Sequence, residues 1–247
     1  MMESTIGKVT PPPLRADLAS AIERSWERLS GPGTWWTGEK RLQIVAETRN
    51  AVHCPLCRER RAALSPYAVK GVHQSLGDLP ESAVEVIHRV RTDAGRLTEG
   101  WLERMLASGL TDAEYVEIVG IIAMTTGLDT FSRGMGTVPR VLPLARPGEP
   151  MRRRPRNARK QIAWVATVAP ADMVEGELNP YPEFGTVHIQ QALSLVPQAV
   201  IEFFDLDVAL YLKQDWIRDF TREYRSLSHV QLELIAAKAS VMNGCYY

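Results

Sequence analysis

Residues 35–57 read WWTGEKRLQIVAETRNAVHCPLC and combine a helical pattern with a pair of cysteines. Apolar residues such as Leu42 and Val45 recur in this stretch at helical spacing, with charged residues between them. Pro55 follows Cys54, and a helix tolerates proline at its first position because the missing N–H needs no partner there. The stretch therefore predicts one helix that runs into the cysteine pair and a second helix that starts at it.

The predicted position of Cys54 and Cys57 favours reactive thiols. At the cap and in the first turn of a helix, free backbone N–H groups point at both sulfurs. Such a position lowers the pKa of a thiol and enriches the thiolate, which is the form that attacks peroxides and disulfides. The pair therefore predicts a redox dithiol.

Two other interpretations of the cysteine pair remain open. Two cysteines spaced by chance behave as small buried hydrophobes. A zinc site needs four ligands, usually from a second paired motif, but the remaining cysteine, Cys245, and the histidines show no paired spacing. We therefore expect neither a metal nor a cofactor. We also expect His73, His88 and Asp129 to be hydrogen-bonded structural groups outside the site.

Composition limits the partners of the chain. Its 247 residues contain 29 Lys and Arg against 29 Asp and Glu, and a neutral chain argues against nucleic acid as the main partner. No apolar run approaches membrane-spanning length, and the N-terminal residues lack a basic and apolar signal. Three cysteines in a chain of this length do not form a disulfide scaffold. We expect a cytoplasmic protein with no nucleic-acid and no membrane partner.

Helical patterns account for the chain up to residue 139. No segment in this part alternates convincingly with period two, so we predict an all-α fold, with a helical domain at 1–139 that carries the Cys-x-x-Cys pair. Further predicted helices lie at 14–29, from about 78 onward, at 98–107, and from a capping box at Thr111 to Gly134.

Prolines and arginines are concentrated in residues 140–184, which we predict to be an ordered linker that wraps a surface. Residues 161–168 are expected to form one extended segment. The arginine-rich run at 152–160 is expected to be solvated or paired within the chain rather than bound to phosphate. Helical patterns return over 185–247, where a second capping box starts at Ser228.

The C-terminal segment shares features with the first cysteine region. When Cys245 is laid on Cys54, Ile235 falls on Ile44. Each of the two cysteines also follows a predicted helix and a sharp turn. The shared order predicts that residues 185–247 are a second, partial copy of the helical unit.

These residues resemble the alkylhydroperoxidase D-like, or carboxymuconolactone decarboxylase, superfamily of all-helical proteins. Its redox members carry a glutamate, eleven residues, Cys-x-x-Cys, three residues and a histidine. Glu233 and Cys245 have that glutamate-to-cysteine spacing, and Ser240-x-x-Asn243-x-Cys245 looks like the peroxidase-related branch. The stretch 107–136 is similar to the later part of the same domain.

The two halves depart from the family pattern in different ways. In the first half, the family's glutamate position falls on Leu42 and its histidine on Arg61. The second half keeps Glu233 and Cys245, but the sequence ends at Tyr247, before a second cysteine. One hypothesis is that a UGA codon follows Tyr247 and is read as selenocysteine, which would make this the main peroxidase site and the first pair an auxiliary dithiol. The alternative is a family branch that ends here, and the gene sequence beyond Tyr247 distinguishes the two.

The resemblance implies a thiol-dependent peroxidase or disulfide reductase of antioxidant defence. In this mechanism Cys57 attacks the peroxide and becomes a sulfenic acid, and Cys54 condenses with it to a disulfide. The implied partners are a peroxide substrate and an external dithiol reductant. Family members assemble as symmetric oligomers, so we expect at least a homodimer.

The residues that assist the thiols are left open. Glu47 and His53 are both candidates for the general base, and Arg58 and Arg61 are candidates to hold the thiolate or a substrate. Two alternative functions remain: a lyase that acts on a small carboxylate, which an arginine would clamp, and a non-catalytic helical scaffold.

Overall fold

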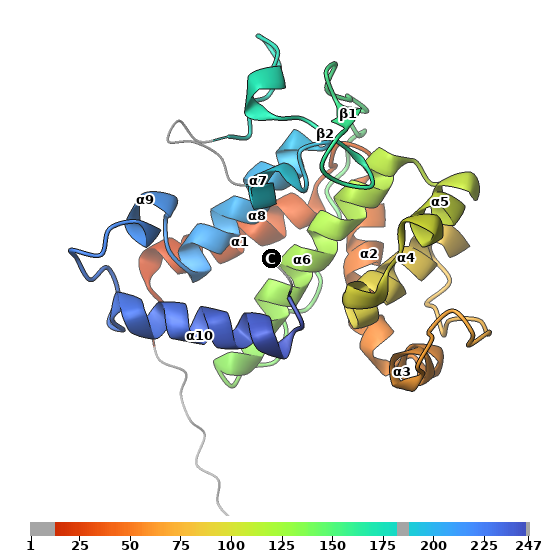
Figure 1. Cartoon of the computed structure of the whole chain (residues 1–247), viewed down its shortest axis with the longest axis horizontal. Coiled ribbons are helices and arrows are strands. Elements are labelled where there is room, and N and C mark those ends of the chain that lie inside the picture. Colours follow the sequence, from red (N-terminus) through yellow and green to blue (C-terminus); the bar gives the residue numbers. More distant parts are fainter. Residues whose placement is uncertain (1–12, 182–187, 246–247) are drawn as a thin grey trace, which may run out of the picture.

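The computed structural model of the chain describes residues 13–181 and 188–245, and it is mostly helical (56% helix; Figure 1). Within these residues, strand is confined to one antiparallel pairing of β1 (Arg159–Lys160) with β2 (Ala166–Thr167). The predicted all-α class is therefore confirmed, whereas the single extended segment expected at 161–168 is wrong, because only the short β2 lies there. An alkylhydroperoxidase D-like arrangement of the helices stays a prediction.

The helices begin where the sequence places capping side chains. Thr37 and Thr98 each accept a hydrogen bond from a backbone N–H in the following first turn. Both predicted capping boxes, which start at Thr111 and Ser228, are confirmed. The helical elements in chain order are α1 (Ala16–Ser30), α2 (Gly38–Asn50), η1 (Ala51–His53), α3 (Pro55–Ala62), α4 (Glu81–Asp93), η2 (Ala94–Arg96), α5 (Glu99–Ala107), α6 (Asp112–Gly134), η3 (Pro170–Asp172), α7 (His188–Gln191), α8 (Pro197–Leu210), α9 (Gln214–Ile217) and α10 (His229–Met242).

The long helix α6 is the centre of the fold (Figure 1). It contacts α2, α4 and α8, and α1 packs against both α2 and α8. Its Ile118 and Ile121 are almost fully buried in the main hydrophobic core. A Cβ on Gly120 would lie 3.3 Å from the Ala199 Cβ, so glycine lets α6 and α8 approach closely.

Helix α8 belongs to the same core as the N-terminal helices. Its Ala199 and Leu206, with Leu195 just before the helix, join the cluster that also contains Trp26 and Trp101. Burial of such side chains removes apolar surface from water, which is the main force that stabilises the bundle. The division of the chain at residues 139 and 184 stays a prediction. Helix α8, which lies beyond the second boundary, nevertheless completes the core of the helices in residues 1–139.

Residues 140–184, predicted as a linker, pack on the N-terminal helices, and their Val165 and Ala166 belong to the main hydrophobic core; the role of this segment as a linker stays a prediction. The backbone N–H groups of Arg146 and Arg152 donate to the carbonyls of Ser30 and Thr34, each at 2.7 Å. The expectation that the arginine-rich run is paired within the chain is confirmed. Its ion pairs are Arg154–Asp112, Arg156–Glu177, Arg159–Asp172 and Lys160–Glu99.

A buried ion cluster joins α2, α6 and α8. Arg41 of α2 lies 2.6 Å from a carboxylate oxygen of Glu202 and 3.8 Å from one of Glu117. The backbone N–H of Trp35 also donates to Glu117, at 2.6 Å. Burial raises the pKa of Glu117 to about 7, although the nearby Arg41 guanidinium opposes the rise. The cluster therefore places titratable groups inside the core.

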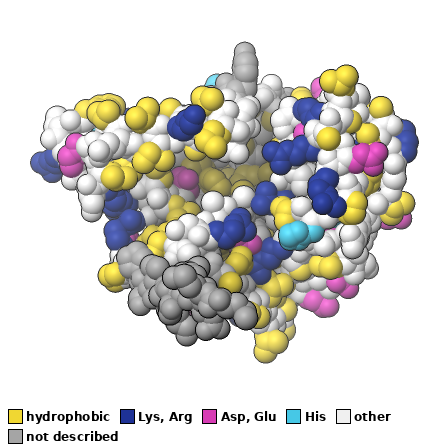
Figure 2. Space-filling view, turned by 90° about the horizontal axis from the view of Figure 1, so that it is seen from below, with side chains coloured by type: hydrophobic (Ala, Val, Ile, Leu, Met, Phe, Trp, Pro, Cys, Tyr) yellow, Lys and Arg dark blue, Asp and Glu magenta, His cyan; other side chains and the backbone are white. Residues whose placement is uncertain are grey.

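Helix α10 leaves large apolar side chains exposed, among them Leu234 and Ile235. Figure 2, which views the molecule from below, shows exposed hydrophobic side chains interspersed with Lys and Arg.

In the described part of the chain, no helix combines the length and the apolar character that crossing a membrane requires. The expected homo-oligomer stays a prediction.

Candidate thiol–imidazole site

The cysteine pair has the predicted local structure. Cys54 is the N-cap of α3, Pro55 holds the first helical position, and Cys57 lies in the first turn. The side chains of Cys54 and Cys57 are 1% and 3% exposed, respectively. The two cysteines lie 3.8 Å apart with no disulfide between them, so both thiols are free.

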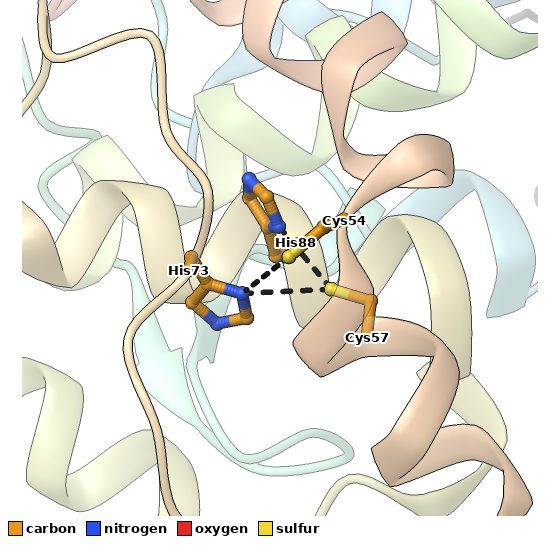
Figure 3. A group of neighbouring side chains, drawn as sticks. All are labelled: Cys54, Cys57, His73 and His88. Carbon is orange, nitrogen blue, oxygen red and sulfur yellow. Dashed lines mark hydrogen bonds between the residues drawn. The ribbon is translucent and has the colours of Figure 1, made fainter.

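His73 reaches both thiols from the loop that joins α3 to α4 (Figure 3). Its Nδ1 lies 3.6 Å from the Cys54 Sγ and 3.5 Å from the Cys57 Sγ. The loop packs tightly on α3 two residues earlier, because a Cβ on Gly71 would lie 2.9 Å from the Leu56 Cδ1. The absence of a side chain at Gly71 therefore helps to bring His73 against the sulfurs.

His88 approaches the pair from α4, and its ring lies next to that of His73 (Figure 3). Its Nδ1 lies 3.2 Å from the Cys57 Sγ, and its side chain is fully buried. The His73 and His88 rings are 4.2 Å apart between centroids. Packing of α4 against α3 and η1 thus brings two imidazoles to one thiol pair. We refer to Cys54, Cys57, His73 and His88 as the thiol–imidazole cluster.

Glu47 of α2 holds the far side of the His88 ring. Its Oε1 lies 2.7 Å from the His88 Nε2 and accepts from the Asn50 side-chain amide at 2.9 Å. Its Oε2 accepts from the Leu76 backbone N–H at 2.9 Å. Burial raises the pKa of Glu47, but these hydrogen bonds, with that of His88 first, outweigh it and the pKa is lowered. A buried carboxylate is therefore aimed at His88.

Glu85 holds the far side of the His73 ring in the same manner. Its Oε2 lies 2.7 Å from the His73 Nε2 and 2.9 Å from the Arg60 Nη1. The indole N–H of Trp101 donates to its Oε1 at 3.2 Å. Burial raises the pKa of Glu85, but His73 and Arg60 outweigh it and lower the pKa to about 2. Each imidazole of the cluster thus has one nitrogen on a carboxylate and the other on sulfur.

These contacts set the charge state of the metal-free cluster. Burial raises the pKa of the Cys54 thiol, but hydrogen bonds from His73 and from backbone N–H groups bring it to about 7. Burial lowers the pKa of His73, but its bonds with Cys57, Glu85 and Cys54 raise it to about 10. Burial also lowers the pKa of His88, and here it outweighs Glu47. The cluster therefore pairs a cationic His73 with thiolate character and keeps His88 neutral.

The expectation that His73 and His88 lie outside the site is wrong. Both rings contact the thiols, which the sequence obscured because the two histidines come from a loop and a helix far along the chain. One signal was present: fifteen residues separate Cys57 from His73, a spacing found between the halves of zinc motifs. The expectation for Asp129 is confirmed, because its carboxylate accepts two hydrogen bonds from Arg49.

The remaining candidate residues lie outside the cluster. His53, Arg58 and Arg61 are exposed, and no hydrogen bond or ion pair joins them to the cluster within the described residues. Glu233 of α10 accepts a hydrogen bond from the Tyr211 hydroxyl, and Cys245 is an exposed free thiol. Residues 246 and 247 fall outside the described residues, so the hypothesis about the chain beyond Tyr247 stays a prediction, as do the catalytic roles.

The cluster brings together groups with defined chemistry. A neutral imidazole on a thiol accepts its proton, two neighbouring thiols form a disulfide, and converging sulfur and nitrogen atoms bind metals. No family model, no curated protein and no solved structure matches the chain, so the functional conclusion rests on the geometry of the cluster.

Proposed function

We propose that the protein is a thiol-dependent peroxidase that reduces a small hydroperoxide with the Cys54–Cys57 dithiol. One observation carries the proposal: the Cys57 Sγ, the His88 ring and the Glu47 carboxylate form a continuous chain, with steps of 3.2 and 2.7 Å. Glu47 accepts from the His88 Nε2–H and so leaves the Nδ1 lone pair facing the thiol. This tautomer is the one that a general base for Cys57 requires.

The chemistry needs two steps that these residues can perform. In the first, His88 takes the thiol proton, the Cys57 thiolate attacks one oxygen of the peroxide, and the O–O bond breaks. The leaving alkoxide takes the proton from His88 and departs as an alcohol, so Cys57 becomes a sulfenic acid. In the second, the Cys54 thiolate attacks the Cys57 sulfur, and the S–O bond breaks. The leaving hydroxide takes the proton of the His73 imidazolium to form water. An external dithiol then reduces the disulfide and supplies the two protons that restore the site.

His73 supports both steps from its place between the sulfurs. Its Nδ1 lies within 3.6 Å of either sulfur, and Glu85 holds its Nε2. A cationic imidazole at this point stabilises whichever thiolate is present, because opposite charges attract strongly in a buried site. The Cys57 thiolate of the first step and the Cys54 thiolate of the second therefore face the same His73 ring, and no charged group has to move between the steps.

Burial favours a peroxide over a protein disulfide as the oxidant. Cys54 and Cys57 are almost completely covered, and attack on a protein disulfide requires close approach of a second chain to the thiol. A small hydroperoxide needs far less space. The proposal also accommodates the departure from the family pattern, because Glu47 and His88 supply a glutamate and a histidine that the motif positions Leu42 and Arg61 lack.

The test is peroxide turnover by metal-free protein with dithiothreitol as the reductant. We expect Cys57→Ser to lose turnover completely. Cys54→Ser should react once and stop at a sulfenic acid that dimedone traps. The matched control is Cys245→Ser, which removes the exposed thiol and should retain the rate.

Mass spectrometry of peptides after one equivalent of peroxide locates the product. A Cys54–Cys57 disulfide is expected in the unsubstituted chain. If the double variant Cys54→Ser, Cys57→Ser consumes peroxide as fast as the unsubstituted chain, the proposed function is wrong.

A further inference from the structure

We propose that the thiol–imidazole cluster binds one Zn²⁺ ion as a tetrahedral site with two cysteine and two histidine ligands. The ligand atoms of Cys54, Cys57, His73 and His88 all lie within 4.8 Å of one another. They come from the cap and first turn of α3, from the loop before α4 and from α4 itself (Figure 3). The four residues thus surround one point from three directions.

The separations between the ligand atoms match those of a tetrahedral zinc complex. Zinc binds sulfur at about 2.3 Å and nitrogen at about 2.0–2.1 Å, which places two sulfurs about 3.8 Å apart and a sulfur and a nitrogen about 3.5 Å apart. The cysteines lie 3.8 Å apart. Three sulfur–nitrogen separations are 3.2, 3.5 and 3.6 Å. Four of the six separations between ligand atoms thus match those of the complex, and the other two are no longer than 4.8 Å.

The hydrogen bonds behind the histidines fit metal ligands. A histidine that binds zinc through one nitrogen almost always donates its other N–H to a carboxylate or carbonyl, which fixes the ring orientation. Here His73 faces Glu85 and His88 faces Glu47, each at 2.7 Å through Nε2. Both Nδ1 atoms consequently face the sulfurs. One histidine held by a carboxylate beside a thiol is the arrangement of a thiol and its general base. Two such histidines around one dithiol supply the four ligands of a tetrahedral zinc site.

The charges of the site also favour a cation at its centre. Two thiolates and one Zn²⁺ sum to zero, so a buried complex with neutral imidazoles carries no net charge. Glu47 fits this charge pattern: its side chain is 1% exposed, and its one ion-pair partner among the described residues is His88. Zinc bound to the His88 Nδ1 would polarise the Nε2–H bond and so strengthen its hydrogen bond to the Glu47 carboxylate.

The donor set selects zinc, and the closed shell indicates a structural site. Two thiolates and two imidazoles in tetrahedral geometry suit zinc, and four protein ligands leave no open position for substrate. The ion would fasten the loop with His73 and helix α4 to the start of α3. It would also shield both thiols, since the same sulfur electrons bind the metal and attack peroxide. The inference goes beyond the proposed function, because zinc binding requires no peroxide chemistry.

The experiment uses the full chain, expressed without an affinity tag in zinc-supplemented medium. After gel filtration, elemental analysis should give about one zinc per chain. X-ray absorption at the zinc edge should fit two sulfurs at about 2.3 Å and two nitrogens at about 2.0–2.1 Å. Replacement of zinc by Co²⁺ should produce thiolate-to-cobalt charge-transfer absorption and the intense visible bands of a tetrahedral complex.

The variants separate this site from other metal binding. Cys57→Ser and His88→Gln should each lose zinc, whereas Cys245→Ser should keep it. The spectra of the unsubstituted chain test the proposal even where a variant fails to fold. The inference is overturned if the unsubstituted chain takes up no zinc from a micromolar solution, or if the absorption data contain no sulfur ligand.

The two proposals fail independently. Zinc loading with the expected spectra, but no peroxide turnover after chelation, supports the metal site and refutes the peroxidase. Turnover by a chain that never binds zinc does the reverse.

Discussion

Glu47→Gln is the most informative single substitution, because it removes a charge and keeps the shape of the side chain. The Glu47 carboxylate accepts from His88 and Asn50 on one oxygen, and from the Leu76 N–H and the Ser75 hydroxyl on the other. Glutamine has one acceptor oxygen and one NH₂ group, which donates. It can therefore satisfy His88 and Asn50, or Leu76, but not all three.

The size of the effect follows from these hydrogen bonds. The oxygen of the introduced glutamine should face His88 and Asn50, so its NH₂ group faces the Leu76 N–H and leaves that donor unpaired. An unpaired buried donor costs about 1–3 kcal/mol, and the partly buried Leu76 N–H falls at the lower end of that range, about 1 kcal/mol. This loss lowers the melting temperature of a chain this size by about 2–4 °C. His88 keeps a hydrogen bond, but to a neutral oxygen. Loss of a carboxylate behind a metal-binding or catalytic histidine costs about 10–100-fold in affinity or rate.

The assay measures both readouts on the same protein. Competition with a zinc chelator gives the zinc affinity, and stopped-flow oxidation of the metal-free dithiol by peroxide gives the rate. Both should fall about 10–100-fold in Glu47→Gln. The matched control is Glu39→Gln, which changes an exposed carboxylate in the first turn of the same helix, and it should leave both values unchanged.

Two results would refute the reasoning about Glu47. The first is a variant that loses stability but keeps the oxidation rate and the zinc affinity, which would make Glu47 a structural residue only. The second is an equal loss in Glu39→Gln, which would trace the effect to the net charge of α2.

Three further predictions concern the core and the cluster. Arg41→Met leaves Glu117 and Glu202 buried without their cation and should lower the free energy of unfolding by about 3–5 kcal/mol; an unchanged midpoint in urea would contradict this. Because the pKa of Glu117 is raised from 4.5 to about 7 in the fold, the native state binds the extra proton, and stability should fall as pH rises through that window, by at most about 3 kcal/mol. The same titration of Glu117→Gln should lack this fall in stability. If the variant and the unsubstituted chain depend on pH equally, Glu117 is not the cause. Zinc should protect both thiols of the cluster from iodoacetamide while Cys245 is alkylated, and a chelator should abolish the protection; mass spectrometry of the labelled peptides measures this.

The sequence by itself determined the local features of this protein. Apolar spacing located the main helices, and side chains such as Thr111 and Ser228 marked helix starts, because a cap needs only atoms within one turn. The same reasoning placed Cys54 at the cap of α3 and Cys57 in its first turn, since Pro55 between them suits the first helical position. Local hydrogen bonding and steric limits decide these features, so a short window of sequence contains the necessary information.

Only the tertiary structure decided the composition of the site. His73 follows Cys57 by sixteen residues and His88 by thirty-one, and nothing in their neighbours indicates that both rings meet one dithiol. Their positions depend on the packing of α4 against α3 and on the path of the intervening loop. Side chains distant in sequence meet only when helix faces bury their apolar surface against one another, and that burial is a property of the whole core rather than of any one segment.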